Sequence, residues 1–151
     1  MPEGILNDLH QDHEEVASLI EQMIKTEDGK ERGAIFKEMM SKLLAHSHAE
    51  QNVLYKKMEK SQDEKSRTFA YEGENEHQIV EQQLQQMARA RHKASEQWTA
   101  QASVLQDLIE HHVEEEESTG FSCARSEFDR EALDKMADQF RKQKQKLLQE
   151  A

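Results

Sequence analysis

Apolar residues recur along this chain at alternating steps of three and four, which is the spacing of helices that each bury one side. Turn-forming residues interrupt the pattern at 26–30 and 61–65, a weaker boundary falls near Ser95, and the sequence STGF closes the fourth stretch at 118–121. Short connections between helices of about twenty residues favour antiparallel neighbours. We therefore predict an all-α protein built as an up-down-up-down four-helix bundle.

A fifth apolar stripe follows, from Ser126 to Ala151. Acidic residues crowd its first half and Lys and Arg its second, which suits the helix dipole, and Ser126 stands where an N-cap is expected. The apolar positions of this stripe are Leu133, Met136, Phe140 and Leu147. We predict a bundle at 1–121 and, at 122–151, a C-terminal helical extension packed on the bundle or on a partner, which leaves a homo-oligomer open.

The composition agrees with a helical protein, because there is one proline, there are five glycines, and 34% of the residues are charged. The net charge of −11 provides no basic stripe for phosphates, which argues against nucleic acid and anionic membrane surfaces as partners. No apolar run approaches the roughly 18 residues of a membrane span, and the acidic start is unlike a secretory signal. We expect a cytoplasmic protein.

Its single cysteine, Cys123, rules out an internal disulfide and a thiolate metal cluster.

Polar residues interrupt each apolar stripe at positions that continue its helical step. Counted from the predicted turns, the histidines among them fall at similar heights, within about one helical turn. These residues are His13 in the first helix, His46 and Glu50 in the second, His77 in the third, and His112 and Glu116 in the fourth. The pattern predicts that six donors meet in one buried layer.

Buried carboxylates and imidazoles are costly unless they are paired, and no Lys or Arg stands at these inner positions to pair with them. A bound cation removes this cost, and nitrogen with carboxylate oxygen suits iron, manganese or zinc better than calcium or a copper thiolate site. The layer is therefore a predicted metal centre. We expect His48, His92 and His111 at the surface, and His10 is held as a reserve ligand.

The segments around these positions resemble the hemerythrin family in its bacterial HHE-domain form. They are DLHQDHEEV, LLAHSHAEQNVLY, ENEHQIV and LIEHHVEEEESTGF, and the likeness spans about residues 5 to 121. The resemblance implies two iron ions in a non-haem, oxo- or hydroxo-bridged centre, with Glu50 and Glu116 bridging them and the four histidines capping them. A ferritin-like di-iron bundle fits less well, because its Glu-x-x-His spacing occurs only once, at Glu74 and His77.

One position departs from the family pattern. Oxygen-carrying hemerythrins have a second histidine one turn before the residue that matches His77, and this chain has Gly73 there. The resemblance then implies about two open coordination positions, one more than in a five-histidine centre, and room beside the metal. Glu74 or Tyr71 could fill that room, although we expect both to face solvent, and Tyr55 is either an outer hydrogen-bond donor or a packing residue.

Several functions stay open at this point. The resemblance implies binding of O2 or a related small oxidant, NO or peroxide, for sensing, storage or detoxification. The alternatives are a peroxide- or NO-consuming di-iron enzyme and an iron-storage or zinc-binding bundle without a redox role. The open position at Gly73 tilts the interpretation toward reactivity with small oxidants rather than dedicated oxygen carriage.

Overall fold

The computed structural model describes residues 2–150, and within that range the chain contains helices and no strand. The segments are α1 (Ile5–Lys25), α2 (Gly29–Glu50), η1 (Gln51–Tyr55), α3 (Lys56–Met58), α4 (Glu64–Arg89), α5 (Glu96–Glu115), η2 (Glu116–Gly120), α6 (Phe121–Glu127) and α7 (Arg130–Glu150), where η marks a π-helix. The predicted all-helical class is confirmed. Within residues 2–150, no helix is long and apolar enough to cross a membrane.

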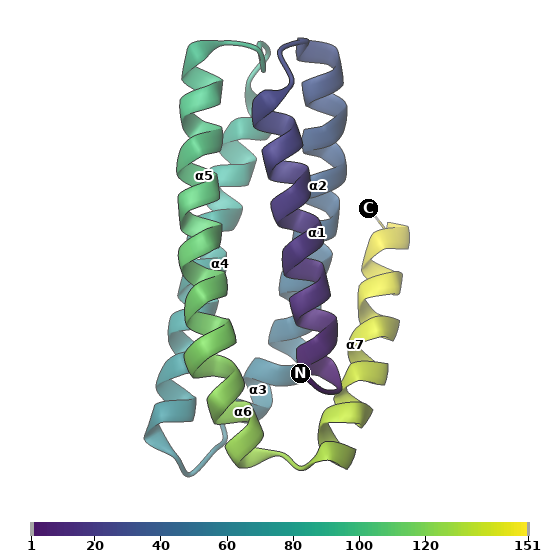
Figure 1. The fold of residues 1–151 in the computed structure, drawn as a ribbon, viewed down its shortest axis with the longest axis vertical. Helices are drawn as coiled ribbons and strands as arrows, with labels where there is room; N and C mark the ends of the chain where they lie inside the picture. Colours follow the sequence, from purple (N-terminus) through teal and green to yellow (C-terminus); the bar gives the residue numbers. More distant parts are fainter. Residues whose placement is uncertain (1, 151) are drawn as a thin grey trace.

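Four long rods stand side by side along the molecule (Figure 1). They are α1, α2 continued by η1 and α3, α4, and α5 continued by η2 and α6. Side chains cap three of the rods, because Asp28, Asp63 and Ser95 each accept a backbone N–H from the first turn of the helix that follows. The turns predicted at 26–30, 61–65 and near Ser95 are therefore real helix boundaries.

The boundary predicted at STGF is wrong. Residues 116–120 continue the fourth rod as a π-helix, and α6 carries it on to Glu127. Gly120 is required for close packing and not for a turn, because a Cβ atom at this position would lie 2.5 Å from Cζ of Phe69. The glycine allows close contact between this rod and α4, so its presence marks packing rather than a turn.

The C-terminal helix also begins later than predicted. Ser126 lies inside α6, and the residue that caps α7 is Asp129, whose Oδ1 accepts a hydrogen bond from the N–H of Ala132 at 2.8 Å. After this turn α7 folds back beside α1 and α2 (Figure 1). Three residues of the predicted stripe, Leu133, Met136 and Phe140, are buried, whereas Leu147 is only partly buried.

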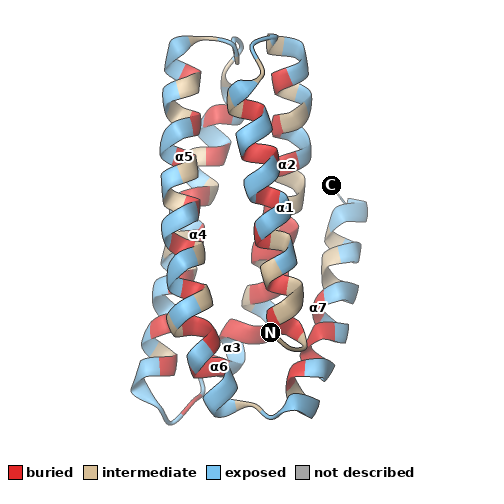
Figure 2. Ribbon diagram, viewed as in Figure 1, coloured by how far each residue is buried: buried red, intermediate tan, exposed pale blue. Residues whose placement is uncertain are grey.

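Two apolar clusters fill the interior, one toward each end of the rods, and buried residues face inward along all four rods (Figure 2). In α1, for example, Leu9 belongs to one cluster and Val16 to the other. His13 lies between them in sequence, and the predicted donors of the other rods are likewise flanked by members of both clusters. Burial of these clusters stabilises the fold and fixes a polar layer between them.

Candidate metal centre

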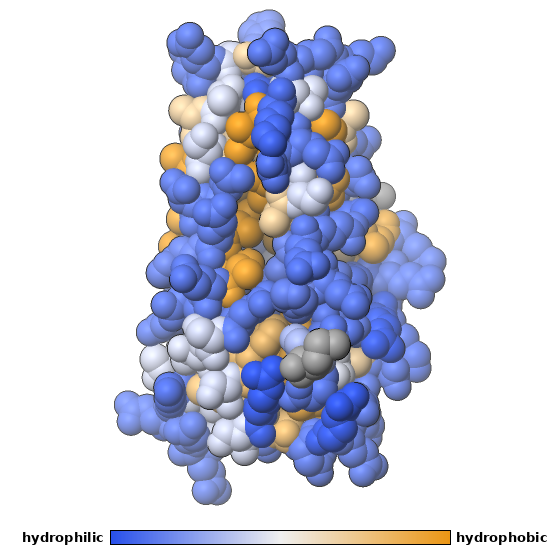
Figure 3. Space-filling model, in the orientation of Figure 1, coloured by the Kyte–Doolittle hydropathy of each residue, from blue (hydrophilic) through white to orange (hydrophobic). Residues whose placement is uncertain are grey.

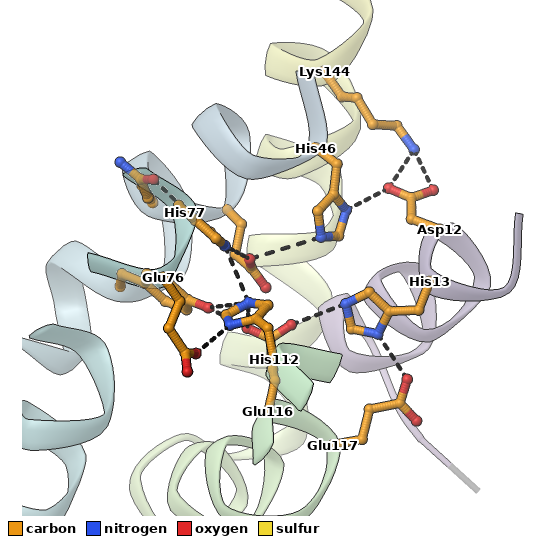
Figure 4. Close-up of polar contacts among 12 residues, drawn as sticks. Asp12, His13, His46, Glu76, His77, His112, Glu116, Glu117 and Lys144 are labelled. Carbon is orange, nitrogen blue, oxygen red and sulfur yellow. Dashed lines mark hydrogen bonds and ion pairs between the residues drawn. The ribbon is translucent and has the colours of Figure 1, made fainter. Parts of the chain in front are cut away.

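The structure brings the six predicted donors together in one buried layer (Figure 4). The four histidines are at most 8% exposed and the two glutamates are 0% exposed. His13 Nε2 lies 3.0 Å from Glu116 Oε1, and His77 Nε2 lies 3.2 Å from Glu50 Oε1. The Nε2 atoms of His46 and His112 lie 3.7 and 3.8 Å from Glu50 and Glu116, respectively. Each of these four histidines thus directs Nε2 toward one of the two carboxylates.

Each histidine is held from behind through its other ring nitrogen. The distances from Nδ1 to the backing oxygen are 2.7 Å for His13 to Glu117, 2.8 Å for His46 to Asp12, 2.7 Å for His77 to Gln51 and 2.6 Å for His112 to Glu76. Because the partners are acceptors, the proton belongs on Nδ1 and the lone pair of Nε2 faces the centre. Histidines that ligate metals in proteins are arranged in this way.

Four residues accept a hydrogen bond from Nδ1 of a donor histidine, and we call them the backing residues: Asp12, Gln51, Glu76 and Glu117. The sequence analysis missed them, although together they link the four rods in a ring. Each is the sequence neighbour of a donor and supports a histidine on another rod, so that Asp12, next to His13, supports His46. In the same way Glu76, next to His77, supports His112. The signal in the sequence was an acid or amide immediately adjacent to each of four donors.

Both His-x-x-x-Glu pairs end where the helix widens. Glu50 is the last residue of α2 before η1, and Glu116 is the first residue of η2. A π-helical turn adds a residue to the turn and so changes which side chains face inward after it; such turns are frequent at functional sites. In η1 the consequence is that Val53, Leu54 and Tyr55 are all buried in succession.

The buried carboxylates lack the partners that their burial requires. Both oxygens of Glu50 and Oε1 of Glu116 make no hydrogen bond, nor does Nε2 of His13. Within residues 2–150, only histidines lie within ion-pair distance of these two glutamates. Because unsatisfied buried carboxylates are strongly unfavourable, this donor set fits a cation.

The pKa values reflect the same crowding of charge. Burial raises the pKa of Glu50 well above its usual range, and the charge of Glu116 adds to this effect. Burial alone would lower the pKa of His13, but Glu116 and Glu117 together raise it to about 9. Burial, reinforced by repulsion from His112, lowers the pKa of His77 well below the ordinary value. Without a cation the layer must therefore retain protons to balance its carboxylates.

The donors form two groups that share one carboxylate. The donor atoms of each group all lie within 4.8 Å of one another, and the groups are His13, His46, Glu50 and Glu116, and Glu50, His77 and His112. We call them the His13/His46 half and the His77/His112 half. Each can hold one ion, and Glu50 lies between both. Both glutamates were expected to bridge; Glu50 belongs to both groups, whereas Glu116 belongs to the His13/His46 half and its Oε2 lies 3.8 Å from Nε2 of His112 in the other half.

The room left by Gly73 is occupied by Tyr55. A Cβ atom at Gly73 would lie 2.7 Å from Cε2 of Tyr55. The ring of Tyr55 stacks on that of His77 with centroids 5.3 Å apart, and its hydroxyl donates to Oε2 of Glu116. The same hydroxyl lies 3.4 Å from Nε2 of His112. Tyr55 is thus an outer hydrogen-bond donor as well as a packing residue.

The two other side chains considered for this room lie elsewhere. Tyr71 is 50% exposed, as expected for a solvent-facing residue. Glu74 lies beside Glu59, and a hydrogen bond between the two carboxyl groups raises the pKa of Glu74 to about 7. Neither residue belongs to the groups of donors that meet in the centre.

A small cavity of about 20 Å³ borders the histidine layer. Its walls are the four histidines, Asp12, Ser47 and the apolar residues Val16, Leu43, Val80, Ile109 and Val113. The cavity has room for one or two heavy atoms beside the centre. Figure 3 shows apolar side chains along the seam between α1 and α5, the helices that supply three of these apolar walls.

A larger hollow of about 520 Å³ lies at the surface between α2, α4 and α7 and contains none of the six donors.

The remaining histidines lie outside the layer. His92 and His111 are exposed, as predicted, and His48 is partly exposed beside Glu81. His10 does not join either donor group, but its Nδ1 lies 2.8 Å from Oε1 of Glu117. It therefore contacts the residue that holds His13 and lies outside both donor groups.

Comparison with known proteins identifies the family of this chain. Residues 4–124 match the sequence profile of the hemerythrin HHE cation binding domain. A protein named DNA nickase from Nostoc sp. (strain PCC 7120 / SAG 25.82 / UTEX 2576) is 26% identical over 145 residues, which cover 93% of this chain and 39% of that protein. This chain thus spans about two fifths of that relative, and the match extends into α7. No solved structure matches the chain. Because the profile covers most of its length, the chain belongs to the hemerythrin family of HHE cation-binding domains.

Proposed function

We propose that this protein holds a non-haem di-iron centre within an up-down-up-down four-helix bundle and binds O2 or a related small oxidant, NO or peroxide, for sensing, storage or detoxification. The supporting observation is the donor layer itself. Four histidines direct Nε2 at two buried carboxylates with unsatisfied oxygens. Each Nδ1 of these histidines lies within hydrogen-bond distance of a side-chain oxygen of a neighbouring rod. Nitrogen and carboxylate oxygen in this combination suit iron.

The chain's own residues divide the tasks at such a centre. A bound pair of irons would supply electrons and open coordination positions to a small ligand. Glu50 and Glu116 would join the two ions, as the resemblance implies. Glu50 belongs to both donor groups, whereas Glu116 belongs to the His13/His46 half and approaches Nε2 of His112 to 3.8 Å. The apolar walls of the adjacent cavity, including Val16, Leu43 and Val80, would exclude bulk water.

The size of the cavity supports a small ligand. At about 20 Å³ it has room for a diatomic molecule or peroxide but not for an organic substrate. Its walls around the histidines are mostly apolar, which suits an uncharged gas. We therefore propose O2, NO or peroxide as the partner class.

A peroxide- or NO-consuming enzyme is the second candidate, and Tyr55 is the observation that favours it. Its hydroxyl donates to Glu116 and lies 3.4 Å from Nε2 of His112, so a proton donor is buried in the site. Turnover of an oxidant needs protons at the centre, whereas reversible binding does not need a supply of them. The name of the Nostoc relative concerns DNA, but the net charge of −11 does not favour a DNA-binding surface on this chain.

Metal analysis combined with an anaerobic-to-aerobic spectrum tests the proposal. We expect close to two irons per chain and a visible absorption that develops when oxygen is admitted. Reversal of this absorption on removal of oxygen, without loss of iron, would support binding, whereas consumption of peroxide over many turnovers would support the enzyme. A chain that cannot be loaded with a near-stoichiometric pair of ions, or that retains zinc and excludes iron, would overturn the di-iron proposal.

A further inference from the structure

We propose that α7 contributes to metal binding. Lys144 of this helix acts through Asp12 as a positioning residue for His46 and thereby strengthens metal binding by the His13/His46 half. This inference rests on the proposed function, since it concerns the same centre. It assigns a role to a helix that begins after residue 124, where the match to the family profile ends.

A continuous chain of contacts leads from α7 into the centre (Figure 4). Lys144 Nζ lies 2.8 and 3.0 Å from the two carboxylate oxygens of Asp12. Oδ2 of Asp12 accepts the hydrogen bond from Nδ1 of His46 at 2.8 Å. The carboxylate is therefore held from both sides, by an ammonium group from α7 and by an imidazole from α2. Fixed in this way, it holds the ring of His46 with Nε2 directed inward.

A second contact from α7 reaches the same histidine directly. Phe140 lies one helical turn before Lys144, so the two side chains share a face of α7. The ring of Phe140 is 0% exposed and meets the ring of His46 edge to face, with centroids 5.7 Å apart. Lys144 Nζ in turn lies 5.2 Å from the centre of the Phe140 ring. The helix therefore restrains His46 through its ring and through its Nδ1 partner.

This arrangement distinguishes Asp12 from the other backing residues. Within residues 2–150, neither Glu76 nor Glu117 has a Lys or Arg within ion-pair distance, and their additional partners are His111 and His10. Asp12 is also mostly buried, with 13% of its side chain exposed. Loss of Lys144 would leave a poorly solvated carboxylate with a single partner and free to turn away from His46. Because loss of an outer partner typically weakens metal binding about 10- to 100-fold, a measurable effect on one half is expected.

The chain offers a matched control in Arg141. Its Nε lies 2.8 Å from Oδ2 of Asp8, so this pair also ties α7 to α1. Asp8, however, makes no hydrogen bond or ion pair with a donor histidine in the described part of the chain. Lys144→Met and Arg141→Met thus remove comparable contacts between the two helices, and only the first removes a contact behind a donor.

The experiment is a titration of the full chain with Co²⁺ in competition with a chelator, for the unsubstituted protein, Lys144→Met, Lys144→Arg and Arg141→Met. We expect two ions in each protein and one ion bound about tenfold more weakly in Lys144→Met alone. Lys144→Arg keeps the positive charge and should recover most of the affinity. The Co²⁺ absorption of the weakened site should change with it, which a purely structural contact would not cause. Urea unfolding of each variant verifies that the fold is intact, and Lys144→Gln replaces Lys144→Met if the latter does not fold.

Further variants assign the effect to one half. In a His77→Ala background the ion that remains should still respond to Lys144→Met, whereas in a His46→Ala background it should not. Equal affinities in Lys144→Met and Arg141→Met, or equal weakening of both ions, would overturn the role of Lys144 and leave the di-iron proposal intact. Failure of the unsubstituted protein to take up a pair of ions would overturn both.

Discussion

The two halves of the centre present the same inward imidazoles but differ in what stands behind them. In the His13/His46 half both backing groups are carboxylates, Glu117 and Asp12. In the other half His77 is held by the amide oxygen of Gln51, a neutral acceptor. A carboxylate makes the imidazole that it holds a stronger donor than an amide does. For the proposed pair of ions, the comparison predicts unequal affinities in the two halves.

The halves also differ in their surroundings. The His13/His46 half gathers four donors and is covered by α7, which contacts His46 through Phe140. The His77/His112 half gathers three, and Tyr55 stacks on one of its histidines. Fewer protein donors leave more coordination positions open to a small ligand. For the proposed centre, we therefore expect that the first half would retain its ion more tightly and that the second would provide the site for ligand exchange.

The largest effect is expected from the carboxylate that joins the halves. Loss of a residue that only hydrogen-bonds a metal ligand costs about 10- to 100-fold in metal affinity, and loss of a ligand itself should cost more. Glu50 belongs to both donor groups. Glu50→Ala should therefore weaken both ions by about a hundredfold or more and leave at most one bound. Glu116→Ala should act mainly on the His13/His46 half. Chelator competition measures both variants, and retention of two ions with unchanged affinity in Glu50→Ala would contradict its shared position.

A second difference between the halves is expected in the pH dependence of the metal-free protein. Glu116 and Glu117 raise the pKa of His13 to about 9, against 6.5 in an unfolded chain. Because the folded state binds this proton more tightly, the contribution to stability is complete below about pH 6.5 and is lost as the pH rises through about 9. The raised pKa of Glu50 acts in the same direction. The pKa of His77 lies well below 6.5, so this histidine stays neutral throughout that range.

Urea unfolding of the chelated protein between pH 6.5 and 9 measures this loss, which should be on the order of 2 kcal/mol. Glu117→Gln removes one of the two carboxylates that raise the pKa of His13, so its stability should fall less over the same range. In the metal-loaded protein the cation replaces the proton, and the stabilisation by metal should grow with pH. A metal-free protein that becomes more stable toward pH 9 would rule out this assignment of protons.

Periodicity located the six donors because each interrupts an apolar stripe at a helical step, and burial in a bundle brings such interruptions to one level. The same reasoning missed Asp12, Gln51, Glu76 and Glu117. These residues stand beside a donor in sequence and so fall off the apolar stripe, where a polar residue is expected at the surface. Their role depends on the neighbouring rod, which no single helical stripe reveals.

The π-helical turns explain a second error. Counting at 3.6 residues per turn fails after Glu50 and after Glu115, because η1 and η2 each shift the inward face. Tyr55 is thereby turned toward Gly73, and the room expected beside the metal is filled from another rod. The error at STGF has a different cause: the glycine was interpreted as a turn signal, but the close contact between Gly120 and Phe69 requires the same residue type.

A smaller effect is expected at the contact between Tyr55 and Gly73. Alanine favours a helix over glycine by about 1 kcal/mol, but the added Cβ of Gly73→Ala would lie 2.7 Å from Tyr55 Cε2. Overpacking of this kind costs about 1 to 3 kcal/mol, so the metal-free variant should be less stable than the unsubstituted protein. In a Tyr55→Ala background the clash is absent and the same substitution should stabilise the fold. Urea unfolding in both backgrounds measures the reversal, and an equal effect in both would refute the contact.

The smallest expected effect comes from a substitution that makes the groups behind the histidines alike in the two halves. Gln51→Glu gives His77 a carboxylate partner at the position of the present amide oxygen, 2.7 Å from Nδ1. The stronger acceptor should make His77 a better donor and tighten the more weakly bound ion by up to about tenfold, without change to the other. Gln51→Met, which keeps the length of the side chain but has no such acceptor, should weaken the same ion. Chelator competition with Co²⁺ follows both ions in each variant, and if the two substitutions move the affinity in the same direction, the acceptor behind His77 is not what distinguishes the halves.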